Sequence, residues 1–269
     1  MDLIKYIFLG FIQGFTEPIP VSSSGHLLII QKLLGEMNVD FETLSILTNF
    51  GSFIAIVFLF RKDIIELIKD FFKYFKNKDK NYYNSYKYCL SIVIGTIPAA
   101  IMGVVVVKLK VFDFLENNMK FVGVTLLITA LFLYLIKDLK GRRSDEEITY
   151  KNALVIGLFQ VVALLPGISR SGATIVGGMK EHLKRDVAFK FSFMLYIPIT
   201  LASMIVGIKD LIETSLSGSL IFFYVVATLV SMVVTYFSTK WFRNLVRDGK
   251  LIYFVYYCLV IGTLVILFM

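Results

Sequence analysis

Residues 6–30 read YIFLGFIQGFTEPIPVSSSGHLLII, and residues 153–179 read ALVIGLFQVVALLPGISRSGATIVGGM. Each stretch is apolar enough to enter a membrane, yet proline and glycine interrupt it, and these residues break a helix. In a bilayer, backbone groups freed by such a break survive only where protein or a wet cavity surrounds them. We therefore predict that each stretch forms a re-entrant helical hairpin whose break lies inside a membrane protein.

The composition of the whole chain excludes an ordinary soluble domain. Of its 269 residues, 57% are hydrophobic and 18% are charged, and the mean hydropathy is +0.75. Six further runs are uncharged and long enough, or nearly so, to cross a bilayer. They are Leu44–Phe60, Tyr88–Val107, Phe121–Ile136, Phe191–Ile208, Thr214–Thr239 and Leu251–Met269. The predicted fold is all-α: a polytopic integral membrane protein with six full transmembrane helices and two re-entrant hairpins.

The basic residues predict how the chain is oriented. Of the 28 Lys and Arg residues, 21 lie in four segments, 61–87, 137–151, 180–190 and 240–250. Because cytoplasmic connections carry an excess of Lys and Arg, we expect these four inside and both termini outside. We therefore interpret the net charge of +8 as a sign of membrane topology, and we expect membrane lipids, not nucleic acid, as partners. Residues 69–80 are basic and aromatic, and we expect them on the anionic inner leaflet.

The two hairpins align without a gap when the sequence is shifted by 147 residues. The identities at this offset are Gly10 with Gly157, Gln13 with Gln160, Ser22 with Ser169, Ser24 with Ser171, Gly25 with Gly172, Lys62-Asp63 with Lys209-Asp210, and Glu66 with Glu213. Each half has one hairpin and three crossings, and an odd number of crossings inverts the second copy. We predict a single membrane domain, 1–269, made of two inverted repeats (about 1–136 and 148–269). Its site is then expected near the midplane, where the broken helices meet.

The first hairpin carries polar residues around its break. Gln13 and Glu17 are four residues apart and share one helix face. Pro18 disfavours helix at Glu17, so the carboxylate is expected near a helix end. The three serines at 22–24 suit the start of the returning helix. A helix N-terminus presents free N–H groups and partial positive charge, which attract phosphate.

The second hairpin offers another helix start and adds a guanidinium, because Arg170 stands between Ser169 and Ser171. The planar donor fork of arginine matches two phosphate oxygens at once. Acid, histidine, serines and arginine together indicate phosphoryl transfer. One alternative is a purely structural Glu17–Arg170 pair that links the two halves, although intramembrane charges mark function by default.

The chemical roles stay open at this point. Ser23 or His26 can act as the nucleophile, and Glu17 or the histidine as the base. We favour Ser23, with His26 as proton shuttle, because a serine at a helix start can point into the anion site. Gln13 and Glu17 are too few for an all-protein metal site, but they can hold Mg²⁺ or Ca²⁺ whose other ligands are phosphate oxygens and water.

These motifs resemble the signatures of a known family. Gln13 and Glu17 lead into PVSSSGH at residues 20–26, and PGISRSGAT occupies residues 166–174. In these motifs, in length and in two-half layout, the chain resembles the bacterial undecaprenyl-diphosphatases, the bacitracin-resistance membrane proteins. The resemblance implies hydrolysis of undecaprenyl diphosphate to undecaprenyl phosphate and phosphate. This reaction recycles the lipid carrier for peptidoglycan synthesis and confers bacitracin resistance.

The resemblance also implies site residues, a cofactor and a location. It implies a divalent cation, Mg²⁺ or Ca²⁺, on Glu17 and Gln13, although many relatives have glutamate where this chain has Gln13. It further implies a bacterial cell-membrane enzyme with its site facing the outer side, a homodimer, and bacitracin as a competitor for the substrate. The implied catalytic residues are Glu17, Ser23, His26 and Arg170. The implied substrate-binding residues are Gln13, Ser22, Ser24, Gly25, Ser169, Ser171, Gly172 and Thr174.

Three rival interpretations account for part of the pattern. A lipid transporter or flippase also fits an inverted repeat with midplane charges. A type 2 phosphatidic acid phosphatase also uses Ser-Gly-His and Ser-Arg runs, but it requires a histidine where this chain has Val176. A non-catalytic membrane scaffold would not explain why Glu17 and Arg170 lie at the midplane, where charged side chains are energetically costly.

Overall fold

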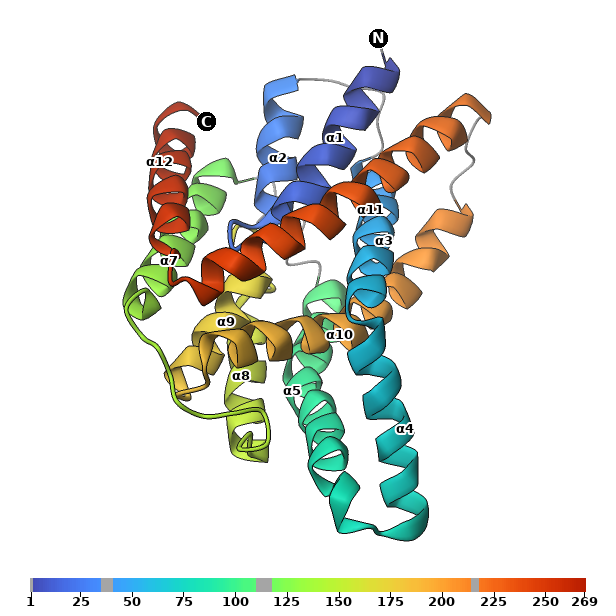
Figure 1. Cartoon of the computed structure of the whole chain (residues 1–269). Coiled ribbons are helices and arrows are strands. Elements are labelled where there is room, and N and C mark those ends of the chain that lie inside the picture. The colour runs from blue at the N-terminus through green and yellow to red at the C-terminus, as the bar shows by residue number, and fades with distance from the viewer. Residues whose placement is uncertain (1, 35–40, 110–117, 214–217) are drawn as a thin grey trace.

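The structure is a computed structural model of the whole chain, and it describes residues 2–34, 41–109, 118–213 and 218–269. Within these ranges the chain is helical, with no strand beyond an isolated bridge between Arg143 and Leu183. The helices are α1 (Asp2–Thr16), α2 (Ser23–Leu34), α3 (Phe41–Leu59), α4 (Arg61–Asn77), η1 (Lys80–Tyr82), α5 (Tyr83–Lys108), α7 (Met119–Ile136), α8 (Tyr150–Val162), α9 (Arg170–Lys180), α10 (Arg185–Glu213), α11 (Gly218–Arg247) and α12 (Ile252–Phe268) (Figure 1). The all-α prediction is confirmed for the described residues.

Five helices of the described chain are long and apolar enough to cross a membrane, namely α3, α5, α7, α10 and α11. Each coincides with one of the predicted crossings, although the start of the Thr214–Thr239 run lies outside the described residues. The sixth run, Leu251–Met269, coincides with α12, an apolar helix of 17 residues. The structure thus bears out a polytopic membrane protein, and the count of six crossings remains a prediction.

The outer faces of the long helices are apolar. On α11 a stripe at four-residue spacing, Val225, Leu229, Val233, Phe237 and Trp241, is between 46% and 64% exposed. Residues four apart lie on one side of a helix. Because these side chains are exposed, that side of α11 faces away from the rest of the protein. An apolar surface of this extent is costly in water and favourable in lipid.

The helices around the first hairpin pack closely through small residues. Gly10 and Gly14 of α1 lie against the backbone of Ala227 and Ser231 on α11, where a Cβ would collide. Such contacts let helix backbones approach one another in a membrane protein. In the second half, Gly157 of α8 lies in the same way against α5. The first helix of each hairpin, α1 or α8, therefore packs on a long helix of the other half.

The basic segments lie in the part of the molecule away from the two termini, with 61–87 reaching the far end and 240–250 nearer the middle (Figure 1). Lys87 donates a hydrogen bond of 3.1 Å to the carbonyl oxygen of Glu146. Arg185 donates to the carbonyl oxygen of Leu139 at 2.9 Å, and its guanidinium fills the space where Gly249 would carry a Cβ. These contacts join all four basic segments, as expected if they share one side of a membrane.

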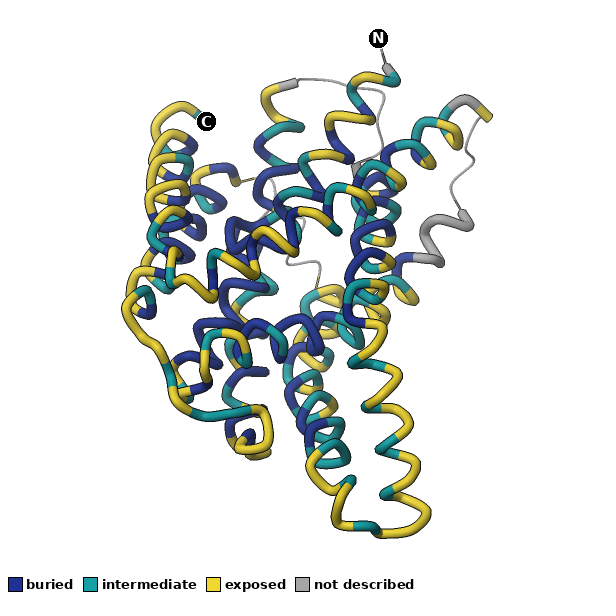
Figure 2. Tube along the Cα trace, viewed as in Figure 1, coloured by how far each residue is buried: buried dark blue, intermediate teal, exposed yellow. Residues whose placement is uncertain are grey.

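The two hairpins meet in the interior. The helix breaks fall at residues 17–22 and 163–169. They overlap the predicted breaks, Pro18–Gly25 and Pro166–Gly172, but the returning helices start at Ser23 and Arg170, three residues earlier than the ends of those segments predict. α9 is buried from Ser171 to Met179, whereas no described residue of α4 is buried (Figure 2). A Cβ on Gly25 would lie 3.1 Å from the Cα of Gly167, so the N-terminus of α2 adjoins the second break.

Candidate active site

The end of α1 presents a carboxylate and an amide on one face. Pro18 follows Glu17, and α1 ends at Thr16, as predicted from the proline. The Nε2 of Gln13 donates to Glu17 Oε2 at 2.9 Å and to Asn49 Oδ1 of α3 at 2.7 Å. The amide therefore holds the carboxylate against α3.

The start of α2 directs a serine at this carboxylate. Ser22 is in the left-handed region, with φ of 68°, and its Oγ accepts a hydrogen bond from the backbone N–H of Gly25 at 3.3 Å. Ser23 is the first residue of α2, and its Oγ donates to Glu17 Oε2 at 2.5 Å. A carboxylate this close to a hydroxyl is placed to take its proton.

The start of α9 repeats the local geometry of α2. Ser169 is the N-cap residue, and its Oγ accepts from the backbone N–H of Gly172 at 3.1 Å. Its Oγ also lies 3.2 Å from that of Ser171, as the Oγ of Ser22 lies 3.4 Å from that of Ser24. Both hairpins therefore end in a serine-capped helix N-terminus, the kind of site that binds anions.

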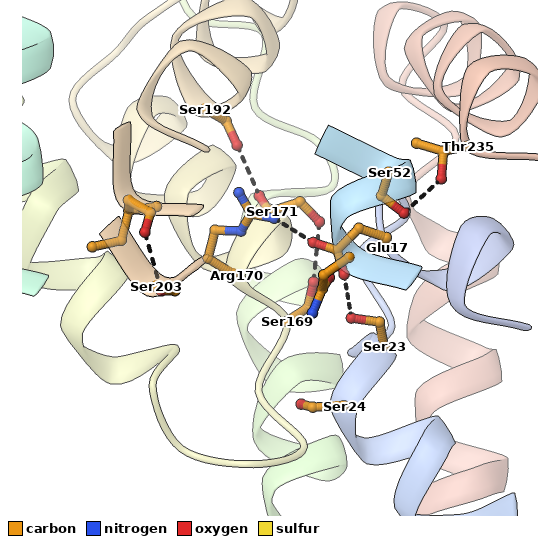
Figure 3. A network of polar contacts seen from close by, with 12 residues as sticks. Glu17, Ser23, Ser24, Ser52, Ser169, Arg170, Ser171, Ser192, Ser203 and Thr235 are labelled. Carbon is orange, nitrogen blue, oxygen red and sulfur yellow. Dashed lines mark hydrogen bonds and ion pairs between the residues drawn. The ribbon is translucent and has the colours of Figure 1, made fainter. Parts of the chain in front are cut away.

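Arg170 completes the cluster from the second hairpin. Its Nη2 donates to Glu17 Oε1 at 2.6 Å, while Ser23 bonds to the other carboxylate oxygen (Figure 3). The guanidinium carbon lies 3.9 Å from the ring centroid of Tyr196 on α10. The Glu17 side chain is 8% exposed and that of Arg170 is 21% exposed. With so little solvent around them, the two charges attract each other more strongly than a surface pair does, which offsets the cost of removing them from water and fixes both groups.

Some predicted residues lie outside this cluster. Thr174 is buried one turn further along α9, where its hydroxyl bonds to Ser192 of α10 at 2.6 Å and to the carbonyl oxygen of Arg170 at 2.9 Å. Neither ring nitrogen of His26 contacts Glu17 or Ser23. Its Nδ1 bonds to the carbonyl oxygen of Ser22, and its Nε2 bonds to the hydroxyl of Tyr257. The structure thus brings together Gln13, Glu17, Ser23 and Arg170 and leaves Thr174 and His26 beside them.

Two neighbours of the cluster were missed by sequence reasoning. Asn49 orients Gln13, and Tyr196 supports Arg170. The offset of 147 residues that aligns the hairpins also pairs these two positions, on α3 and α10. Their residue types differ, so no identity at this offset marked them.

The donor set fits a divalent cation only in part. Among the described residues no group of three His, Cys, Asp or Glu side chains could hold a metal ion. However, the Oε1 of Gln13 is buried without a hydrogen-bond partner, and it belongs to the residue that touches the Glu17 carboxylate. An amide oxygen and a carboxylate are ligands that Mg²⁺ and Ca²⁺ accept when phosphate and water supply the others.

Comparison with known proteins decides the family. The family model described as bacitracin resistance protein BacA matches residues 6–264. The chain belongs to the bacitracin resistance protein family. This membership covers both hairpins and all the long helices, so the cluster of Glu17, Ser23 and Arg170 lies within the matched region.

Relatives in this family carry an enzyme name. The chain is 44% identical over 266 residues to undecaprenyl-diphosphatase 1 of Bacillus licheniformis, covering 99% of this chain and 98% of the relative. It is 40% identical to undecaprenyl-diphosphatase 3 of Bacillus anthracis, with the same coverage. It is 41% identical to undecaprenyl-diphosphatase 1 of Halalkalibacterium halodurans, covering 98% of this chain and 95% of the relative. The resemblance drawn from the motifs is therefore confirmed along nearly the full length.

Proposed function

We propose that this protein is a membrane phosphatase that hydrolyses undecaprenyl diphosphate to undecaprenyl phosphate and inorganic phosphate. The observation that carries the proposal is the contact of Ser23 and Arg170 with the two oxygens of Glu17, at two adjoining helix N-termini. A nucleophile, a base, a cation and two anion-binding helix ends are the groups that phosphoryl transfer needs. Relatives that match almost the whole chain bear the name of this activity.

In the first step, Ser23 attacks the terminal phosphorus of the diphosphate. Its Oγ–H is already hydrogen-bonded to Glu17 Oε2, so the carboxylate takes the proton as the Oγ–P bond forms. The bond between this phosphorus and the bridging oxygen breaks, and undecaprenyl phosphate leaves. Glu17 then passes its proton to the leaving phosphate.

In the second step, water hydrolyses the phosphoserine. Glu17 takes a proton from the attacking water and returns it to the Oγ of Ser23 as phosphate leaves, so the enzyme is regenerated. Ser23 is favoured over His26 as nucleophile because the hydroxyl faces the base, whereas both histidine nitrogens are engaged elsewhere. The proton shuttle assigned above to His26 is unnecessary in this mechanism.

Arg170 binds the charge that develops on the transferring group. It uses Nη2 for Glu17, and its guanidinium lies over the ring of Tyr196. Its remaining donors can therefore bind two phosphate oxygens. Ser169 and Ser171 at the start of α9, and Ser22, Ser24 and Gly25 at the start of α2, are proposed to bind the same diphosphate.

Glu17 and Gln13 are the residues that would hold a divalent cation, Mg²⁺ or Ca²⁺, together with the phosphates. The cation would neutralise the diphosphate and polarise its oxygens. The buried, unpartnered Oε1 of Gln13 supports this assignment. In this chain the two protein ligands would be the neutral amide of Gln13 and the carboxylate of Glu17, so the phosphates of the substrate would supply much of the negative charge that binds the cation.

We further propose a membrane placement with the site open to the outer side of the bacterial cell membrane. The four basic segments then lie in the cytoplasm, and α12 is the sixth crossing. The pairs α1–α2 and α8–α9 are the re-entrant hairpins of two inverted repeats, and the matching geometry of their serine caps supports this. At the outer face the enzyme would remove the diphosphate that bacitracin competes for. A homodimer remains a prediction.

The proposed reaction is tested with purified protein and undecaprenyl diphosphate in detergent micelles. We expect release of one phosphate per lipid, with undecaprenyl phosphate as the other product. A transporter that uses the same site would move the lipid across vesicles and release no phosphate, and that result would overturn the proposal. Geranylgeranyl and farnesyl diphosphate in parallel assays measure the preference for prenyl chain length.

A further inference from the structure

Tyr257 of α12 contacts His26 of α2 across 231 residues of sequence. Its Oη lies 2.7 Å from the Nε2 of His26, and the two rings stack with centroids 5.5 Å apart and planes 12° apart. The next residue, Cys258, places its Sγ 3.8 Å from the carbonyl oxygen of Pro20 in the first break. α12 therefore touches both the break and the helix that follows it.

The surroundings of His26 decide which nitrogen carries the proton. Its Nδ1 lies 2.8 Å from the carbonyl oxygen of Ser22, and a carbonyl oxygen can only accept a hydrogen bond. Nδ1 therefore carries hydrogen and donates to Ser22. In the neutral ring, Nε2 is then an acceptor, and the hydroxyl of Tyr257 is its donor.

Ser22 needs the support that this chain of contacts provides. Its φ of 68° is in the left-handed region, which costs a residue with a side chain free energy that the surroundings must offset. Two bonds from His26 hold its carbonyl oxygen in this conformation, one from the ring Nδ1 at 2.8 Å and one from the backbone N–H at 3.2 Å. Ser22 directly precedes Ser23, whose Oγ meets Glu17 at 2.5 Å, so the Ser22 backbone sets where that hydroxyl points.

We propose that Tyr257 is a positioning residue that fixes His26 with Nδ1 protonated, and that His26 in turn holds the Ser22 backbone so that Ser23 faces Glu17. The effect on turnover rests on the phosphatase function proposed above, whereas the contact itself does not. His26 acts here through the backbone and exchanges no proton with Ser23. α12 thus contributes to the site although it lies at the far end of the sequence.

The contact can be measured without any enzyme assay. The chain has two histidines, His26 and His182, so protein labelled with ¹⁵N-histidine gives two sets of ring signals in nanodiscs. His182→Gln assigns them by removing one set. We expect His26 to show a protonated Nδ1 and a hydrogen-bonded, unprotonated Nε2 in the wild type.

Tyr257→Phe is the decisive variant, because it keeps the stacked ring and removes only the hydroxyl. We expect it to shift the Nε2 signal of His26 and leave His182 unchanged. The matched control is Tyr256→Phe, on the neighbouring and 62% exposed tyrosine of the same helix, which should move neither signal. An unchanged His26 signal in Tyr257→Phe would overturn the proposed contact.

The positioning role is tested by turnover in the same samples. Loss of one neutral hydrogen bond predicts that Tyr257→Phe lowers kcat by roughly threefold to tenfold with little change in KM. Glycine adopts positive φ without strain, so a protein with Ser22→Gly no longer needs His26 to hold this conformation. In that protein, adding Tyr257→Phe should lower kcat by less than about twofold relative to Ser22→Gly alone. An equal fall in both backgrounds, or none in the first, would overturn the positioning role. A wild type that releases no phosphate would instead refute the phosphatase function, while the histidine spectra still decide the contact.

Discussion

The Oγ of Ser23 and the Oε2 of Glu17 lie 2.5 Å apart, across the break that separates α1 from α2. The two residues are six apart in sequence, a spacing at which side chains do not meet on one continuous helix. The break brings them together, because α1 ends at Thr16 and α2 begins at Ser23. The hairpin is thus the device that pairs a nucleophile with its base.

Glu17→Gln is expected to fold and to lose most activity. The amide keeps the size of the side chain and bonds to Arg170 through its oxygen, but it cannot take the proton of Ser23. Loss of a general base typically costs roughly 10²–10⁴ in rate. Phosphate release at saturating Mg²⁺ measures the effect, and Glu66→Gln on the exposed face of α4 is the control. Near wild-type release by Glu17→Gln would remove Glu17 from the base role.

A phosphoenzyme on Ser23 is the second expectation. Rapid acid quenching during turnover should trap a phosphoserine, which survives acid, and peptide mass spectrometry should place it at Ser23. Ser23→Ala should abolish the adduct, whereas Ser24→Ala should keep it, because Ser24 makes no contact with Glu17 in the structure (Figure 3). An acid-labile adduct on His26 would reverse the assignment of the nucleophile.

The cation requirement gives a third prediction. A chelator should stop phosphate release, and Mg²⁺ or Ca²⁺ should restore it. Gln13→Glu adds a second carboxylate beside Glu17, and more ligand charge tightens cation binding, so half-maximal activity should need less Mg²⁺ than in the wild type. Gln31→Glu on α2 serves as the control for added charge. Activity that persists in chelator for both proteins would exclude a divalent cation.

The proposed orientation is tested by cysteine labelling in intact cells. In a background without Cys89 and Cys258, Asp145→Cys should be shielded from an impermeant thiol reagent, because it lies among the basic segments. Lys32→Cys, at the end of α2 near the termini, should be labelled (Figure 1). The opposite pattern would invert the topology and move Glu17 to the cytoplasmic side.

Local sequence features were sufficient for several parts of this structure. The proline after Glu17 and the serines at 22–24 predicted where α1 ends and α2 begins, because chain geometry near proline and helix capping act over a few residues. The uncharged runs predicted the long helices for a similar reason, since the bilayer sets their length and composition. The two isolated charges in matching hairpins suggested a Glu17–Arg170 pair as an alternative, and the structure contains this ion pair.

Contacts between distant helices could not be predicted in this way. Asn49 bonds to Gln13 across 36 residues and Tyr257 bonds to His26 across 231, and neither pair carries a spacing that marks it. Such pairs depend on how α3 and α12 pack, which close approaches of small residues decide. For the same reason the sequence did not predict that the ring nitrogens of His26 would contact Ser22 and Tyr257.

Arg170→Lys separates the two roles that the structure allows for this arginine. Lysine keeps a positive charge, so it would satisfy Glu17 if ion balance were the whole function. Phosphoryl transfer requires more, because charge spreads over several oxygens and the guanidinium can donate to two of them at fixed geometry. Lysine also loses the planar stack on Tyr196, where the guanidinium carbon lies 3.9 Å from the ring centroid.

Losing one preorganised donor typically costs roughly 10²–10³ in turnover, and we expect a fall of this size for Arg170→Lys. Protein yield and thermal stability in detergent should change little, because the ion pair with Glu17 survives. Arg247→Lys, on a side chain that is 61% exposed at the end of α11, is the matched control and should retain full activity. Arg170→Ala should be worse than Arg170→Lys, since Glu17 and the diphosphate then face each other without the positive charge of this side chain between them. A lysine variant within about threefold of the wild type would show that charge alone suffices and that the second donor of the guanidinium is not used in the reaction.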